Sequence, residues 1–312
     1  MLKLAQTHPY PNRLLERYRL DCRQRQRASL VGSHVVRRRG QSLEFRELTP
    51  YMPGDDVRHV DWRASARLAG RDEYLVRRFM AEEQLTLVIS VDARPSTELP
   101  EALPKLQIAA WLAEAVAWIA LRSGYRVFLH SLFGRGWTGL AQLPAAASRS
   151  RIRGALQRFA SGSPAAAPNL GVLRPYLPPT AVWLILTDFY FGVESGNLLA
   201  RRLNQAQDGL RWVVLADLDS WPHERALLHS GANLIEGPDL ARSDPCDITD
   251  DNLRRVEVDI ETHKARFLKL TGRAQCEMRW AWEAESRPDP LAFFQRHFAT
   301  DLVLRRLFMR DS

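Results

Sequence analysis

The chain contains few cysteines and no long hydrophobic run. Its three cysteines lie far apart in 312 residues and form no Cys-x-x-Cys pair, which argues against a zinc site or a disulfide framework. No stretch of about 18 apolar residues is present, and the first twenty residues lack the apolar segment of a signal peptide. We therefore expect a cytoplasmic protein without a membrane span.

Several catalytic patterns are also missing from the sequence. The phosphate-binding pattern Gly-x-x-x-x-Gly-Lys-Ser/Thr does not occur, and no Ser-His-Asp or Cys-His arrangement follows from the residue spacing. A metal-dependent hydrolase would need carboxylates that converge on one ion, usually with a histidine. The sequence therefore predicts a protein that is not an enzyme, with a metal-dependent hydrolase as the weakest alternative.

The excess positive charge is confined to the first quarter of the chain. Residues 1–80 carry 17 Lys and Arg against 9 Asp and Glu, a difference of +8, which equals the net charge of the whole chain. Arginine supplies 40 of the 44 basic residues, and its planar fork suits carboxylates and phosphates. Binding of nucleic acid or another polyanion through this quarter is an alternative function.

From residue 85 onward, short apolar runs alternate with amphipathic stretches of helical period. The apolar runs predict buried strands at 85–92, 125–133, 181–189, 210–217 and 274–283. The amphipathic stretches predict helices at 103–124, 148–160, 197–207, 252–272 and 289–310. This alternation is typical of a doubly wound α/β fold with a mostly parallel sheet.

We expect three parts in the chain. The first is a basic N-terminal extension (1–84) that includes a small β-rich subdomain. The second is the α/β domain (85–290), and the third is an amphipathic C-terminal helix (291–312) packed on it.

Asp92 ends the predicted strand 85–92, and Asp188 lies at the end of the predicted strand 181–189. In a doubly wound sheet, ligands bind at the carboxyl ends of the strands where the strand order reverses. If these two strands are neighbours, both carboxylates face the same crevice.

The residues around these aspartates resemble the metal-ion-dependent adhesion site of von Willebrand factor A (vWA) domains. The vWA pattern is Asp-x-Ser-x-Ser after the first strand, a threonine on a second loop, and an aspartate after the fourth strand. Asp92, Ser96 and Asp188 match this pattern, whereas Arg94 replaces the middle serine and Pro168 stands at the threonine position.

The resemblance implies a vWA-like fold with a degenerate adhesion site. A guanidinium at position 94 can pair with Asp92 or Asp188 in place of an ion. We therefore expect a partner-binding crevice of Asp92, Arg94, Ser96 and Asp188 without a cofactor. If Mg²⁺ does bind, its ligands are expected to be Asp92, Ser96 and Asp188.

The segment from Gly40 to Glu82 is similar to the signature of the domain-of-unknown-function family 58. That signature contains Glu-Phe, Pro-Gly-Asp-Asp-x-Arg, Asp-Trp and Ala-Arg in this order. The matching residues are Gly40, Glu44, Phe45, Tyr51, Pro53, Gly54, Asp55, Asp56, Arg58, Asp61, Trp62, Ala66, Arg67 and Glu82. Together with the vWA-like part, the resemblance covers about residues 20–290.

The acids of this signature predict a structural latch rather than a catalytic cluster. Asp55 and Asp56 are adjacent, so in an extended chain they point in opposite directions. We expect charge-assisted hydrogen bonds to hold the segment to the sheet, with Asp55 as a cap and with Trp62 and Tyr51 packed beneath it. The proposed latch residues are Glu44, Phe45, Tyr51, Gly54, Asp55, Asp56, Arg58, Asp61, Trp62 and Arg67. A partner-binding surface on the same segment remains a compatible alternative.

The family resemblance also implies a partner. Members are commonly associated with MoxR-type AAA+ ATPases, and many carry N-terminal transmembrane helices that this sequence lacks. The leading hypothesis is therefore a chaperone-associated adaptor that binds a MoxR-type ATPase or its client through the vWA-like domain.

Overall fold

The computed structural model divides the chain into two compact units. Residues 30–84 form the hairpin unit, and residues 1–29 together with 85–312 form the sheet unit. The structure describes residues 11–20, 43–52, 57–67, 74–81, 85–99, 104–134, 139–160, 165, 167–177, 181–207, 212–218, 221, 224–225, 234–235, 246–247, 249–271, 276–280 and 308–310.

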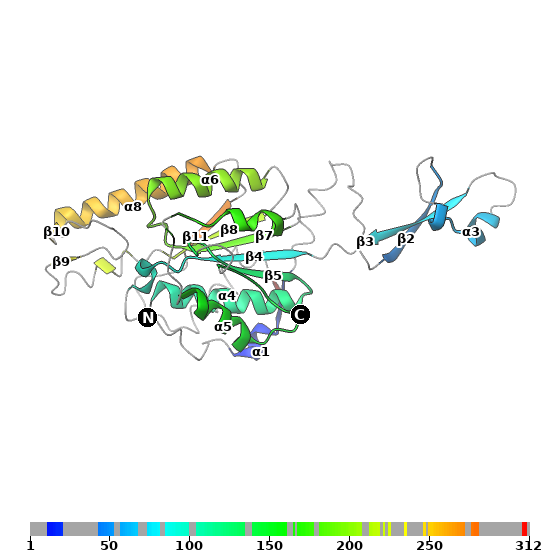
Figure 1. Ribbon diagram of the computed structural model, residues 1–312, viewed down its shortest axis with the longest axis horizontal. Coiled ribbons are helices and arrows are strands. Elements are labelled where there is room, and N and C mark those ends of the chain that lie inside the picture. Colours follow the sequence, from blue (N-terminus) through cyan, green and yellow to red (C-terminus); the bar gives the residue numbers. More distant parts are fainter. Residues whose placement is uncertain are drawn as a thin grey trace. The chain divides into compact units, whose positions relative to one another are not determined.

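The sheet unit is built on a six-stranded sheet (Figure 1). Its strands, in spatial order, are β11 (Cys276–Trp280), β8 (Trp212–Asp217), β7 (Val182–Thr187), β4 (Thr86–Val91), β5 (Arg126–Ser131) and β6 (Leu140–Gln142). Five strands run parallel, and only the edge strand β6 is antiparallel to its neighbour. The predicted α/β class with a mostly parallel sheet is confirmed.

Helices cover both faces of this sheet, as Figure 1 shows. One face packs against α4 (Lys105–Arg122) and α5 (Arg149–Ala160), and the other against α6 (Val193–Gln207) and α8 (Asp250–Leu270). All residues of β4 and β7 are buried, which explains why these strands are continuous apolar runs rather than alternating ones.

Helix α4 is the most deeply buried helix described. Of its 18 residues, only Trp118 and Arg122 are not buried, because the sheet lies on one side and α5 on the other. A mostly apolar helix such as this belongs inside a protein, and its three buried polar residues are Lys105, Gln107 and Glu114. Beyond its end, Gly124 adopts a left-handed φ of +81°, which lets the chain turn into β5.

The strand order reverses between β4 and β7. The chain proceeds from β4 to β5 on one side, and then returns to place β7 and β8 on the other side. Val91 of β4 pairs with Leu186 of β7, so the residues that follow these strands are neighbours. Asp92 and Asp188 therefore emerge side by side at the switch point of the sheet.

Both ends of the described chain contribute to the sheet unit. Helix α1 (Asn12–Leu15) and strand β1 (Tyr18–Leu20) bury Leu15 and Leu20 in the core that also contains α4. The segment from Asn12 to Leu20 thus packs with the sheet, although the sequence grouped it with the extension 1–84.

The end of the predicted C-terminal helix is a strand instead. Phe308–Arg310 form β12, which pairs antiparallel with β1. This pairing supplies backbone partners that the last turn of a helix would lack. Residues 291–307 of the predicted helix lie outside the described residues.

The hairpin unit contains a two-stranded antiparallel ribbon of β2 (Leu43–Pro50) and β3 (Leu75–Ala81). A short 3₁₀ helix, η1 (Val57–His59), and helix α3 (Trp62–Ala66) lie between these strands in the sequence. The register of the ribbon shifts between Phe45 and Glu47, which marks a β-bulge.

Candidate functional site

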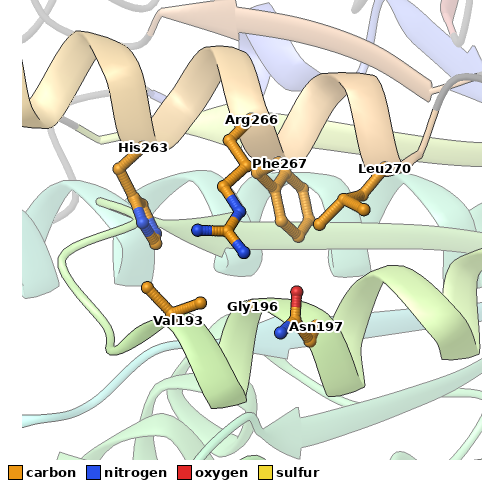
Figure 2. A pocket seen from close by; sticks show the side chains of 7 residues that line it. All are labelled: Val193, Gly196, Asn197, His263, Arg266, Phe267 and Leu270. Atoms are coloured by element: carbon orange, nitrogen blue, oxygen red, sulfur yellow. The ribbon is translucent and has the colours of Figure 1, made fainter.

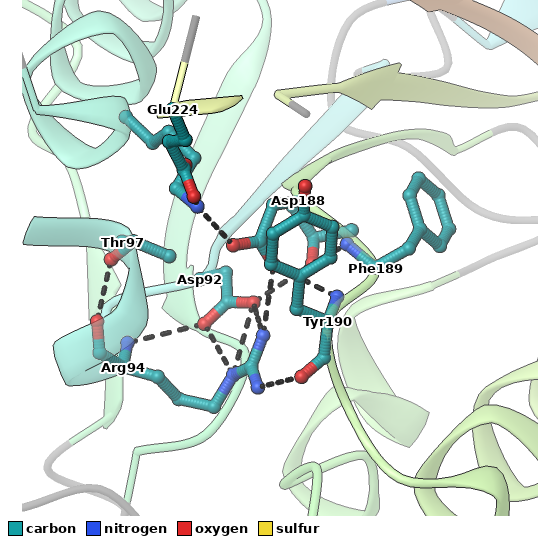
Figure 3. A network of polar contacts seen from close by, with 9 residues as sticks. Asp92, Arg94, Thr97, Asp188, Phe189, Tyr190 and Glu224 are labelled. Carbon is teal, nitrogen blue, oxygen red and sulfur yellow. Dashed lines mark hydrogen bonds and ion pairs between the residues drawn. The ribbon is translucent and has the colours of Figure 1, made fainter. Parts of the chain in front are cut away.

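Arg94 joins the two aspartates at the switch point (Figure 3). Its Nε donates to Asp92 Oδ1 at 3.0 Å, and its Nη2 donates to Asp92 Oδ2 at 2.7 Å. The same Nη2 donates to Asp188 Oδ1 at 3.0 Å, and Nη1 donates to the carbonyl oxygen of Tyr190 at 2.9 Å. The guanidinium thus bridges the loops that follow β4 and β7.

Lys105, the first residue of α4, supplies a second cation. Its Nζ lies 3.0 Å from Asp188 Oδ2 and 3.0 Å from Glu224 Oε1. The ammonium also lies 4.5 Å from the ring centre of Tyr190, in a cation–π contact. At 1% exposure, Lys105 is among the largest fully buried side chains described.

Two residues next to Asp188, Thr187 and Phe189, help to position this charge cluster. The hydroxyl of Thr187, the last residue of β7, donates to Asp92 Oδ2 at 2.8 Å. Phe189 adopts a left-handed φ of 63°, which is unusual for a bulky residue and costs on the order of 1 kcal/mol or more. Its buried ring packs against Phe267 at 5.2 Å, and this packing holds the turn that presents Asp188.

The two buried carboxyls differ in their pKa. Burial raises the pKa of Asp92, and the neighbouring Arg94 offsets only part of that rise. Burial acts in the same direction on Asp188, but the charges of Lys105 and Arg94 outweigh it and hold the pKa below its usual value. For Lys105, burial would lower the pKa, yet Asp188 and Glu224 outweigh it and raise the pKa. Asp188 and Lys105 therefore form a stable ion pair at neutral pH.

The residues at this crevice do not fit a divalent-ion site. Mg²⁺ needs near-octahedral oxygen ligands, usually with several water molecules. Each of the four carboxylate oxygens of Asp92 and Asp188 already lies within 3.2 Å of a protein donor. Two of these donors, Arg94 and Lys105, are cations, and an ion would have to displace them.

The sequence comparison also aligned Ser96 and Pro168 with ligand positions of the vWA pattern. Ser96 is buried in the short 3₁₀ helix η2 (Pro95–Glu98), directly after Arg94 and Pro95. Pro168 lies on the loop that leads to η4 (Gly171–Tyr176), and it has no hydroxyl to offer. The loop is held to the end of β5 by its neighbour Asn169, whose N–H donates to Leu132 O at 2.7 Å.

A buried chain of hydrogen bonds crosses the sheet behind this loop. Trp183 Nε1 donates to Ser90 Oγ at 2.8 Å, and Ser90 lies 2.9 Å from His130 Nδ1. His130 Nε2 lies 2.9 Å from the carbonyl oxygen of Asn169. Since that carbonyl can only accept, the arrangement requires a proton on Nε2 of His130. Burial lowers the pKa of His130 to about 4, so the ring is neutral at neutral pH and its Nδ1 accepts from the hydroxyl of Ser90.

A third aspartate lies at the same edge of the sheet. Asp217, the last residue of β8, is 2.7 Å from the Nζ of Lys264 on α8. Three adjacent parallel strands thus carry an aspartate at this edge, namely Asp92 after β4, Asp188 after β7 and Asp217 at the end of β8. Each aspartate contacts a cation of the protein. This edge is a row of neutralised acids rather than an exposed anionic cleft.

The latch residues fall in the hairpin unit, and the structure corrects part of that prediction. Asp61 caps α3, because its carboxylate accepts from the N–H of Ala64 at 3.0 Å. Trp62 and Tyr51, predicted to be packed beneath the segment, are 63% and 36% exposed. Aromatic side chains become buried only where a core surrounds them, and the two-stranded ribbon offers little core.

The other latch residues occupy varied positions. Arg58 lies on η1 and Arg67 follows α3, and both are exposed, whereas Glu44 and Phe45 pair with Met80 and Phe79 in the ribbon. Gly54, Asp55 and Asp56 lie outside the described residues, so the predicted cap by Asp55 stays a prediction.

A small pocket lies between α6 and α8 (Figure 2). Its lining residues are Val193, Gly196, Asn197, His263, Arg266, Phe267 and Leu270. Burial and the nearby charges of Arg266 and Lys264 lower the pKa of His263. The pocket is shallow, and its lining is mostly the packing surface of the two helices.

Comparison with known proteins identifies the family. The family model described as "Protein of unknown function DUF58" matches residues 47–266, which is more than half of the chain. The chain belongs to the DUF58 family. The match covers residues 47–84 of the hairpin unit and the crevice of this DUF58 protein. A search of curated proteins finds no match. None of the helices described here combines the length and the hydropathy needed to span a lipid bilayer.

Proposed function

We propose that this DUF58 protein is a non-enzymatic adaptor that binds another protein at the carboxyl edge of a vWA-like domain. The observation that carries the proposal is the donor set around Asp92 and Asp188. All four carboxylate oxygens accept hydrogen bonds or ion pairs from the protein itself. A general base or nucleophile must reach its substrate, whereas these groups are buried and paired.

The crevice is proposed to act without a metal ion. In the vWA pattern, an ion held by the adhesion site accepts a carboxylate from the partner. Here Arg94 and Lys105 supply the positive charge permanently, so the two loops have a fixed geometry. Binding of the partner is therefore expected to be independent of divalent cations.

The recognition surface is proposed to be the rim above the buried charges. Leu99, which follows η2, is 40% exposed, and Val193, the first residue of α6, is 44% exposed. Tyr190 is half-buried between the two loops, with its ring over Lys105. Exposed apolar residues on a rigid frame are suited to protein recognition, since little conformational entropy is lost on binding.

The proposed partner is a MoxR-type AAA+ ATPase or its client in the cytoplasm. The support for this choice is the family resemblance of the signature and of the vWA-like residues. In such a pair, the ATPase would hydrolyse the nucleotide, and this chain would present or receive a client.

A pull-down with substitutions on the rim tests the proposal. Purified MoxR-type ATPase from the same genome is mixed with the wild-type chain, with Leu99→Asp and with Val193→Asp, in buffer that contains EDTA. We expect the wild type to retain the ATPase and each rim variant to lose at least tenfold in affinity. Rim positions are chosen because substitution of the buried Asp92 would also disturb folding.

The matched control is Val258→Asp, since Val258 is an exposed apolar residue on the outside of α8. This variant should bind like the wild type. Wild-type binding that requires Mg²⁺, or rim variants that bind as well as Val258→Asp, would refute the proposed surface.

A further inference from the structure

One long stretch of the sheet unit contains no acidic residue. Residues 115–187 hold eight arginines and neither aspartate nor glutamate, a difference of +8 over 73 residues. The hairpin unit is almost balanced by comparison, because residues 30–84 carry ten arginines and nine acids, a difference of +1. A surface with a strong positive charge is therefore expected in the sheet unit rather than in the hairpin unit.

The acid-free stretch contributes to one layer of the sheet unit. This layer consists of α4, α5 and the segment Asn12–Leu20, which lie on the same face of the sheet (Figure 1). Arg149 of α5 contacts the side chain of Asn12, and the N–H of Leu20 donates to Ser123 Oγ at 2.9 Å. These contacts place α1 beside the start of α5, and β1 beside the end of α4.

We call the arginine side chains of this layer the arginine face. Its eight members are Arg13, Arg17, Arg19, Arg122, Arg149, Arg151, Arg153 and Arg158. The same elements contain only two acids, Glu16 and Glu114, and one lysine, the buried Lys105 at the far end of α4.

Both acids of the layer are already paired with arginine. Glu114 is buried, and its carboxylate lies 2.8 Å from Arg149 Nε and 3.0 Å from Arg153 Nε. Glu16 lies 3.6 Å from Arg122 in an exposed ion pair. In the part of the chain that the structure describes, no acid pairs with Arg13, Arg17, Arg151 or Arg158.

Helix α5 presents two of the unpaired arginines to solvent. Arg151 and Arg158 are exposed and lie seven residues apart, which places them on the same side of the helix, about 10 Å apart along its axis. Gly154, also exposed, lies between them in the sequence, and a Cβ there would meet no atom within 4 Å. The helix surface between the two guanidinium groups is thus open to a ligand.

The arginine face lacks the apolar groups that other kinds of contact need. None of the large apolar side chains that the structure shows as exposed belongs to Asn12–Leu20, α4 or α5. Protein interfaces have an apolar core, and helices that lie in a membrane surface insert an apolar side. A surface that offers mainly guanidinium groups is suited to phosphates instead.

We propose that the arginine face binds the phosphate backbone of double-stranded nucleic acid without reading its sequence. Guanidinium groups donate paired hydrogen bonds to phosphate oxygens, and such contacts carry no sequence information. Single strands are bound by stacking their bases on aromatic rings. Trp118, the tryptophan nearest to this surface that is not buried, is half-buried and already covered by Arg122, whose guanidinium lies 4.7 Å from the ring centre.

This surface is distinct from the rim proposed for protein binding, and neither proposal depends on the other. It also differs from the first quarter of the chain, which the sequence suggested for polyanions. Of that quarter, only the segment Asn12–Leu20 belongs to the arginine face.

Fluorescence anisotropy with a labelled DNA duplex of about 20 base pairs tests the proposal on the full-length chain. We expect saturable binding at about 50 mM salt that weakens steeply as salt is added. With four unpaired arginines on phosphates, the slope of log K against log salt should be about −3 to −4, since each contact contributes about −0.9. Duplexes of unrelated sequence should bind within about twofold of each other.

Two double variants that remove the same charge locate the binding surface. Arg151→Gln/Arg158→Gln should weaken duplex binding at least tenfold at about 50 mM salt and reduce the slope by about 2. The matched control is Arg254→Gln/Arg266→Gln, on exposed positions of α8 at the other face of the sheet, and it should bind within about twofold of the wild type. Since all four side chains are exposed, both variants should melt like the wild type.

Three results would overturn the proposal. The first is the absence of saturable duplex binding at about 50 mM salt. The second is an equal loss of affinity in the two double variants, which would assign the binding to overall charge. The third is tighter binding, through Arg151 and Arg158, of polyglutamate or of phosphatidylserine-containing vesicles than of the duplex, which would assign the surface to an acidic protein or to a membrane.

Discussion

The ammonium nitrogen of Lys105 lies 3.0 Å from Oδ2 of Asp188, and both side chains are almost completely shielded from solvent. This contact connects the start of α4 with the loop after β7, which lie far apart in the sequence. Such a buried pair is costly to form but more costly to break, because one charge would then remain without a partner. The crevice is therefore a fixed structural element of the sheet unit.

Replacing Lys105 should destabilise the sheet unit strongly. Lys105→Met keeps most of the side-chain volume but leaves Asp188 with less compensation, and we expect a loss of about 3 kcal/mol in the free energy of unfolding. Urea denaturation followed by circular dichroism measures this loss. Lys269→Met, an exposed position near the end of the same unit's α8, should change stability by less than about 0.5 kcal/mol. Equal effects of the two substitutions would contradict a structural ion pair at Lys105.

Arg94→Lys should also be destabilising, although the charge is conserved. Lysine cannot reproduce the paired contacts with Asp92 together with those to Asp188 and the carbonyl of Tyr190. We expect a loss of about 2 kcal/mol in the free energy of unfolding, measured by the same urea titration. The control is Arg151→Lys, since Arg151 is exposed on α5. If Arg94→Lys is as stable as Arg151→Lys, the positive charge alone, and not the guanidinium geometry, stabilises the crevice.

The sequence predicted the sheet and the position of the crevice well. Fully buried parallel strands produce continuous apolar runs, and the terminal aspartates of the runs at 85–92 and 181–189 marked one edge. That Asp92 and Asp188 are neighbours depends on strand order, which the runs alone do not determine. The structure supplies it through the pairing of β4 with β7.

Other features depend on contacts that no local pattern encodes. Lys105 was missed because a lysine at the start of a helix normally faces solvent, and only long-range packing brings it to Asp188. The contact of Thr187 with Asp92 was not predicted, because the vWA pattern pointed to the neighbouring Asp188 instead. Conversely, Trp62 and Tyr51 were expected to be buried because aromatic side chains usually are, but the hairpin unit exposes them.

His130 should make the stability of the sheet unit depend on pH. Its pKa is about 4 in the folded protein and 6.5 ordinarily, so the unfolded chain binds more protons between these values. The neutral form of His130 therefore contributes about 3 kcal/mol to the free energy of unfolding above pH 6.5. This contribution is lost as the pH falls to 4.

Urea titrations at pH 7 and pH 4.5 measure this dependence. His130→Gln can keep a donor for the carbonyl of Asn169, and it should lose stability at pH 7 but less additional stability on acidification than the wild type. If the wild type and the variant lose the same amount between the two pH values, His130 is not the group responsible.

Removal of the helix cap should destabilise the hairpin unit. Asp61→Ala leaves the N–H of Ala64 without its acceptor, and we expect a loss of about 1 kcal/mol. In a unit of this size, that loss corresponds to a fall of roughly 4–8 °C in the melting temperature. Differential scanning calorimetry measures it, and Asp61→Asn, which retains a capping oxygen, should stay within about 2 °C of the wild type. If Asp61→Ala and the wild type melt at similar temperatures, the cap by Asp61 does not stabilise this segment.

The most direct test of the crevice is a titration of the purified, EDTA-treated chain with MnCl₂ and MgCl₂ by isothermal calorimetry. Because Arg94 and Lys105 already neutralise Asp92 and Asp188, we expect no saturable binding of either ion up to millimolar concentration and no change in melting temperature. Stoichiometric binding of Mn²⁺ that Asp92→Asn abolishes would contradict this expectation, because it would show that these carboxylates hold a metal ion rather than the protein's own cations.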